Sequence, residues 1–173
     1  MVLRGHVGHI ARDWIEAVMY AAVVLAVLFV FCWPFKIDGV SMSNTLRHND
    51  RIVVSRFAVW ANNLDRGDMV VCRILDDGQR AIVVKRIVGL PGDHVKISDG
   101  KIFLNGLEHN ESYLYNVVTE GYIEVDLANG EYFVLGDNRA LSFDSRAAGP
   151  VGRADIVGKV MARWYPFTEF TRF

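Results

Sequence analysis

The chain has 173 residues, of which 51% are hydrophobic, and its 19 Lys and Arg residues nearly balance its 20 Asp and Glu residues. This balance is unlike that of a basic nucleic-acid-binding protein, and the hydrophobic content excludes a disordered chain. The two cysteines, Cys32 and Cys72, are too few for a disulfide framework. The length suits one folded domain, with or without an anchor, and excludes two sizeable domains.

An apolar segment comes first in chain order. Residues 17–35 are 19 consecutive residues without a charge, which as a helix would span roughly 28 Å, the thickness of a bilayer core. Trp14 and Trp33 stand at its two ends, where tryptophan favours the headgroup level. We therefore predict a single transmembrane α-helix as an anchor over residues 14–35, after a short N-terminal tail at residues 1–13. A buried core helix and a cleaved signal peptide are the alternatives, and the flanking charges do not decide the topology.

Short segments rich in β-branched and aromatic residues follow the apolar run, between turn signals. Four of them lie at residues 51–56, 68–75, 81–88 and 131–135. They predict an all-β catalytic domain of antiparallel sheets over residues 36–173.

Two further segments of this domain depend on their flanking residues. Residues 101–104 lie between Asp99-Gly100 and Asn105-Gly106, which tolerate a positive φ, so this segment is predicted to be part of a hairpin. Residues 154–165 fit a strand or a short helix. The polar residues 107–122 are interpreted as an excursion from the sheet.

A first candidate for chemistry follows the anchor directly. Ser41 and Met42 come two and three residues after Gly39. A glycine at this spacing lets backbone N–H groups approach a reacting carbonyl, as an oxyanion hole requires. A solvated loop serine is the simpler reading of this segment taken alone.

A second candidate is the pair Lys85-Arg86 within an apolar strand. Alternation puts these two side chains on opposite faces, so one of them shares an apolar face. A buried lysine loses its proton more readily than a lysine in water, and it acts as a general base when its pKa falls from roughly 10.4 to about 7 or 8. An edge-strand lysine that prevents aggregation is the alternative.

The third candidate is a polar loop at residues 136–146, directly after the apolar segment 131–135. Its density of charged and hydroxyl side chains indicates a loop ordered by hydrogen bonds, in which Ser142 would orient a neighbouring amine. Two acidic and two basic side chains can pair within the loop: Asp137, Asp144, Arg139 and Arg146.

In this order the segments resemble the conserved boxes of type I signal peptidases, the bacterial-type serine/lysine leader peptidases. The matching segments are Gly39-x-Ser41-Met42-x-x-Thr45-Leu46, residues 66–71, Lys85-Arg86 through Asp93, and Gly136-Asp137-Asn138-Arg139 with Ser142-x-Asp144-Ser145-Arg146 and Gly149. The resemblance covers residues 34–165.

The resemblance implies a membrane-anchored serine protease whose domain lies outside the cytoplasm. Ser41 would be the nucleophile and an oxyanion donor, and Lys85 the general base. Ser142 would orient the lysine amine, and Gly39 and Met42 would bind substrate. The loop would be held by Asp137, Arg139, Asp144 and Arg146. The implied partners are signal peptides of exported preproteins and the lipid bilayer, with no nucleic acid and no cofactor.

The chain also departs from the family pattern. Asn44 stands where the family usually has proline, and Ala140-Leu141 replace the usual Asp-Asn pair, so a shifted loop or an altered substrate preference is expected. Gly39 lacks the hydroxyl that some members use as a second oxyanion donor. The five histidines have no metal-ligand spacing, so no metal is predicted.

Two other functions fit parts of the sequence. A membrane-tethered β-domain that binds partners or assists assembly would explain the anchor and the strands, but it gives no reason for the three clusters. The related serine-lysine autoproteases of regulatory repressors would need a DNA-binding segment where this chain has its apolar run.

Overall fold

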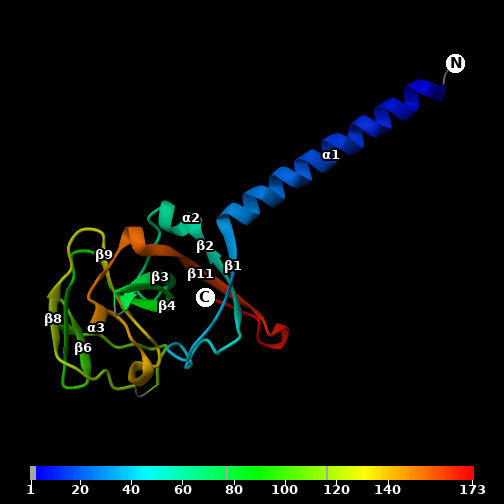
Figure 1. Cartoon of the computed structure of the whole chain (residues 1–173). Coiled ribbons are helices and arrows are strands. Elements are labelled where there is room, and N and C mark those ends of the chain that lie inside the picture. The colour runs from blue at the N-terminus through cyan, green and yellow to red at the C-terminus, as the bar shows by residue number, and fades with distance from the viewer. Residues whose placement is uncertain (1–2, 77, 116) are drawn as a thin grey trace.

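The computed structural model describes residues 3–76, 78–115 and 117–173, without the side chains of residues 3–11 and 28–31. A long helix, α1 (Leu3–Phe31), extends away from a domain built from antiparallel strands (Figure 1). The predicted all-β fold of this domain is confirmed. The predicted N-terminal tail, residues 1–13, lies largely outside the side chains that the structure describes.

The larger sheet of the described chain runs in the order β1-β2-β11-β3-β4-β9-β10, with β12 paired to β11. Its strands are β1 (Cys32–Lys36), β2 (Arg51–Ser55), β3 (Met69–Asp76), β4 (Gln79–Gly89), β9 (Glu131–Leu135), β10 (Val151–Gly152), β11 (Ile156–Tyr165) and β12 (Thr171–Arg172).

The smaller sheet runs in the order β7-β6-β5-β8. Its strands are β5 (His94–Ser98), β6 (Lys101–Leu104), β7 (Leu107–Glu108) and β8 (Ile123–Asp126). The predicted hairpin is confirmed, because β6 pairs with β5 and β7 across turns in which Asp99 and Asn105 both have φ 53°. The excursion begins two residues later than predicted, since Leu107 and Glu108 still pair with β6.

Short helical turns complete the domain. They are α2 (Arg56–Trp60), α3 (Ser145–Ala148), and the 3-10 turns η1 (Arg139–Leu141), η2 (Arg153–Asp155) and η3 (Phe167–Glu169).

Two boundaries differ from the sequence prediction. The helix ends at Phe31, whereas the predicted anchor continues to Phe35, and Cys32–Lys36 pairs with β2 as strand β1. Pro34 accounts for this end, because proline lacks an N–H and pushes the preceding residue toward an extended backbone. The ambiguous segment 154–165 is mostly strand β11, which pairs with both β2 and β3.

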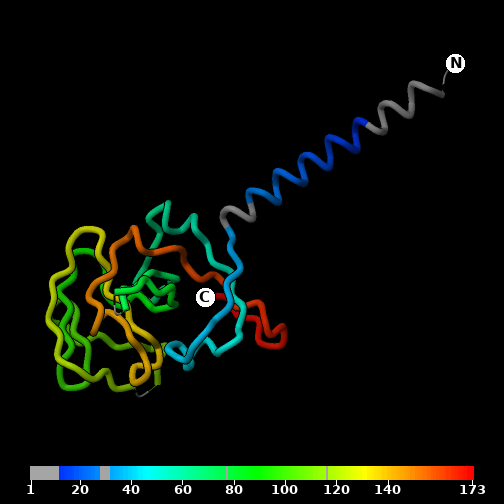
Figure 2. Tube along the Cα trace, in the orientation of Figure 1, coloured from blue at the N-terminus to red at the C-terminus, as the bar shows by residue number. Residues whose placement is uncertain are grey.

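The described part of α1 has exposed side chains from Arg12 to Val27. Across all the side chains that the structure describes, no helix reaches the length and hydropathy that a bilayer crossing needs. Figure 2 follows the same path as a Cα trace, from α1 through β1 into the domain.

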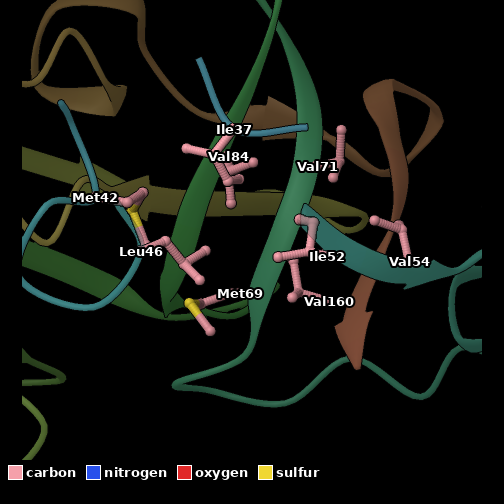
Figure 3. Packing of buried hydrophobic residues seen from close by; sticks show 9 residues of the cluster. All are labelled: Ile37, Met42, Leu46, Ile52, Val54, Met69, Val71, Val84 and Val160. Atoms are coloured by element: carbon pink, nitrogen blue, oxygen red, sulfur yellow. The ribbon is translucent and has the colours of Figure 1, made fainter. Parts of the chain in front are cut away.

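Three buried clusters hold the domain together. The one nearest the candidate site joins the loop after β1 to β2, β3, β4 and β11, as Figure 3 shows. It consists of Ile37, Met42, Leu46, Ile52, Val54, Met69, Val71, Val84 and Val160. Two of its members, Met42 and Val84, are the chain neighbours of Ser41 and Lys85, so this cluster fixes both residues in relation to one another.

Candidate active site

Ser41 lies in the loop between β1 and β2, within a short turn. Gly39 has φ +105°, a backbone conformation that side-chain-bearing residues rarely adopt. The Thr45 and Leu46 N–H groups donate to the Met42 carbonyl at 2.8 and 2.7 Å. Because Met42 and Leu46 are buried in the core, the turn is held from below and Ser41 stays at its surface.

The loop after β9 holds the serine turn from the other side. The Asn138 N–H donates to the Ser41 carbonyl at 3.0 Å, and the Asn138 amide donates to the Val40 carbonyl at 3.1 Å. Asn44 donates to the Asp137 carbonyl at 2.9 Å, a bond that the proline usual at this position cannot form. The two loops therefore form one hydrogen-bonded unit.

Lys85 lies on β4 opposite Val70 of β3, and only 2% of its surface is exposed. No ion pair compensates its amine in the described part of the chain. Burial lowers the pKa of Lys85 below its ordinary value of 10.5, against the opposing effects of Asp144 and Cys72. Burial therefore shifts Lys85 toward the neutral amine, which is the form that accepts a proton.

The acidic residues of the polar loop find different partners. Arg146 Nε donates to Asp144 Oδ1 at 2.9 Å, and the Gly136 N–H donates to Asp144 Oδ2 at 3.0 Å. Burial raises the pKa of Asp144, but these hydrogen bonds outweigh it and hold the pKa below its ordinary value of 3.8. Asp144 is therefore the anion that orders the loop next to Lys85.

Asp137 pairs outside its own loop. Arg86 Nε donates to Asp137 Oδ1 at 2.8 Å, and Arg86 Nη2 lies 2.5 Å from Asp137 Oδ2. Thr45 also donates to this carboxylate, at 2.5 Å. The buried Arg86 thus links β4 to both loops that surround Ser41. Arg86 was not among the site residues predicted from the sequence.

Gly136 allows the close approach of Ser142 and Ser41. A Cβ atom on Gly136 would lie 2.1 Å from Ser142 Oγ and 2.6 Å from the Ser41 carbonyl oxygen. Ser142 Oγ is buried close to Asp144. Among the described residues, no partner lies in hydrogen-bonding geometry to this oxygen. A polar oxygen is thus held next to the Ser41 backbone.

A hollow opens beside Ser41. Gly39 and Met42 line it, as do β4 residues on the N-terminal side of Lys85. The full lining is Phe35, Ile37, Asp38, Gly39, Ser41, Met42, Ile82, Val83 and Val84. Most of these side chains are apolar, so the hollow suits an apolar segment next to a serine hydroxyl.

Metal ligands do not gather at this site: within the described ranges, no three His, Cys, Asp or Glu side chains lie together in a way that could hold an ion. The site offers a hydroxyl, a buried amine and backbone N–H groups, which is the set that nucleophilic acyl transfer requires.

The sequence model described as signal peptidase, peptidase S26, matches residues 11–165. The chain belongs to this family. Signal peptidase I U of Bacillus subtilis is 36% identical over 165 residues, which cover 90% of this chain and 87% of that protein. Signal peptidase IB of Staphylococcus aureus is 35% identical over 177 residues, which cover 91% of each chain.

Among solved structures, a signal peptidase I from Enterococcus faecalis matches with 30% sequence identity and a TM-score of 0.47. That match covers 55% of this chain and 94% of the other. The resemblance drawn from the sequence motifs is confirmed by the family match and by both relatives, and this member of the signal peptidase family is an enzyme of the serine peptidase class.

Proposed function

We propose that this signal peptidase family member removes signal peptides from exported preproteins, with Ser41 as nucleophile and Lys85 as general base. The observation that carries the proposal is the burial of Lys85 without an ion pair in the described chain, one residue from Val84, which lines the hollow that holds Ser41. A lysine in such surroundings is costly for stability, and its lowered pKa makes it a better candidate for a proton acceptor than a lysine in water.

The chemistry follows from the groups present. Neutral Lys85 takes the proton of the Ser41 hydroxyl as its oxygen attacks the scissile carbonyl, and the resulting ammonium then donates a proton to the leaving amine. In the proposal the Ser41 N–H stabilises the oxyanion, and Gly39 adds no side-chain donor. Water, deprotonated by the same amine, then hydrolyses the acyl-enzyme. Ser142 orients the amine.

The substrate in this proposal is an extended peptide that ends in small residues. An extended strand points alternate side chains to the same wall, so a narrow apolar hollow next to Ser41 selects small residues at alternate positions. Gly39 and Met42 line that hollow and are the substrate-binding residues of the proposal.

Membrane anchoring by the apolar run completes the proposal. The run at residues 17–35 has bilayer length in the sequence, and part of it lies outside the described side chains. The described part carries large apolar side chains that are more than half exposed, among them Tyr20 and Leu25. Figure 1 shows α1 directed away from the domain. In the proposal a bilayer surrounds α1, and the domain lies at the membrane surface, outside the cytoplasm.

The direct test compares variants of the full chain on a labelled preprotein. Ser41→Ala and Lys85→Met are each expected to lower kcat by a factor on the order of 10⁴, because nucleophile and base act as one unit. Lys101→Met is the matched control, since Lys101 is exposed and pairs with the exposed Glu108. Circular dichroism checks that each variant is folded. A folded Lys85→Met protein with normal turnover would contradict the dyad.

A further inference from the structure

The excursion between β7 and β8, which carries Glu111 and Tyr113, contributes a buried acid to the neighbourhood of the candidate active site. Glu111 Oε2 lies 2.5 Å from Arg139 Nη2, and the two side chains are only 10% and 2% exposed. The same arginine donates through Nη1 to the hydroxyl of the buried Thr119 and through Nε to the Gly136 carbonyl at 3.0 Å. Arg139 thus joins the excursion to the start of the active-site loop, which is the loop of residues 136–146.

Tyr113 joins the same acid to the second buried arginine. Its hydroxyl donates to Glu111, and the Arg86 guanidinium lies 4.1 Å from the centre of its ring. A guanidinium over an aromatic face is attracted by the ring electrons, more strongly where water is excluded. Glu111 and Tyr113 therefore contact both arginines, Arg139 and Arg86, from one short segment.

These two arginines hold adjacent residues of the active-site loop. Arg86 binds the Asp137 carboxylate, and Arg139 binds the Gly136 carbonyl. The next residue, Asn138, donates to the Ser41 carbonyl at 3.0 Å. Any shift of this loop therefore moves the backbone that carries the nucleophile.

The charges of the two buried arginines show why the excursion is needed. Asp137 neutralises Arg86, but within the described chain the ion-pair partner of Arg139 is Glu111. A buried charge without its partner is strongly destabilising, so Arg139 without Glu111 would turn toward water and leave Gly136. The charge of Glu111 thus determines whether Arg139 remains bound to the Gly136 carbonyl of the active-site loop.

We propose that Glu111 and Tyr113 are positioning residues of the active site, which hold Arg139 and Arg86 so that residues 136–138 fix the Ser41 backbone. This inference rests on the proposed function for its kinetic consequence, whereas its structural consequence is independent of the reaction. It gives a catalytic purpose to a segment that the sequence presents only as a polar excursion.

The test uses Glu111→Gln in the detergent-solubilised full chain, which keeps the shape of the side chain and removes its charge. We expect kcat on a labelled preprotein to fall by about 10- to 100-fold with KM within about twofold, as for a small misplacement of reacting groups. Hydrogen exchange of the Asn138 amide should become at least about tenfold faster, while amides of β5 and β6 keep their protection.

The matched control is Asp93→Asn, which removes the acid of another partly buried pair, Asp93 with Arg66 at 2.9 Å. Asp93 also accepts from the Leu90 N–H at 2.7 Å and from the Asn105 amide at 2.8 Å, two residues outside the active-site loop. The control should speed exchange at Leu90 and leave kcat and the Asn138 amide unchanged. A purely structural role for Glu111 would make the two variants behave alike.

A second variant keeps the test decisive if Glu111→Gln does not fold. Tyr113→Phe retains the ring against Arg86 and removes only the donor to Glu111, so the same two readouts should change by several-fold. Unchanged kcat and unchanged Asn138 exchange in a folded variant would overturn the inference. If the unaltered chain cleaves no preprotein, the proposed function fails, and the exchange result alone then decides the positioning role.

Discussion

At the scale of single residues, the proposed mechanism depends on a lysine that the fold buries. Burial is the largest cause of the lowered pKa of Lys85, and Asp144 and Cys72 oppose it only in part. A lowered pKa means that the unfolded chain binds this proton more readily than the folded chain does. Stability from this residue is therefore lost as the pH falls from 10.5 toward the folded pKa. In the proposed mechanism catalysis changes in the same direction, because only a neutral amine can accept the serine proton.

At the scale of elements, the candidate active site is a contact between two loops, one after β1 and one after β9. Core residues hold the first loop from below, and Arg86 on β4 holds the second. Gly136 lies where the loops touch. The strands position the two loops, and the absence of a side chain at Gly136 allows the loops to approach each other closely.

Gly136→Ala tests this contact. Its Cβ atom would meet Ser142 Oγ at 2.1 Å and the Ser41 carbonyl oxygen at 2.6 Å, so the loops must separate. We expect unfolding free energy to fall by about 1–3 kcal/mol and kcat by roughly 100-fold, measured by denaturant unfolding and preprotein cleavage.

Gly152→Ala is the matched control for this change, because Gly152 has φ −69° and a Cβ atom there would meet open space. Its effect should stay within about 0.5 kcal/mol. A Gly136→Ala protein that matches this control in both stability and turnover would show that the two loops do not need their close contact.

At the scale of the whole molecule, a β-domain that carries the site is joined to one long helix (Figure 1). The connection is short, since α1 ends at Phe31 and β1 begins at Cys32. Aromatic and basic side chains gather at this junction, where the Arg56 guanidinium lies 4.8 Å from the centre of the Trp33 ring. Ser41 thus follows the end of α1 by ten residues, with β1 between them.

The proposed anchoring predicts that the chain stays with the membrane pellet after an alkaline carbonate wash. Val24→Arg together with Leu25→Arg should release it, because each arginine at the centre of a spanning helix costs about 2.5–3.5 kcal/mol or more. Leu75→Arg is the control, an exposed leucine of the β-domain. Release of the unaltered chain by the wash would contradict the anchor.

Much of this fold follows from local sequence patterns. Alternating β-branched residues and turn pairs such as Asn105-Gly106 predict strands and hairpins, because side-chain direction and positive φ are properties of a few neighbouring residues. The role of residues 156–165 as a strand between β2 and β3 was left open, since pairing with distant strands decides it. The end of α1 was placed too late because the apolar run continues past Pro34.

The site was predictable where motifs carry it. Ser41 and Lys85 stand in boxes with a fixed order, and their assigned roles stay predictions. The ion pairs of Arg86 with Asp137 and of Arg139 with Glu111 were not predicted, because residues that meet only through the fold leave no spacing in the sequence. Pairing within the loop, expected for four charged residues, occurs for Asp144 with Arg146.

The proposal that Lys85 is the general base is tested most directly by titrating its amine with nitrogen-detected NMR in the full chain. The signal is assigned with Lys85→Met, and the pH profile of kcat/KM is measured beside it. We predict that the amine titrates below its ordinary value of 10.5, and that the acid limb of kcat/KM has the same midpoint. Titration of Lys85 at 10.5 in a chain that keeps full activity below about pH 5 would contradict a lysine base.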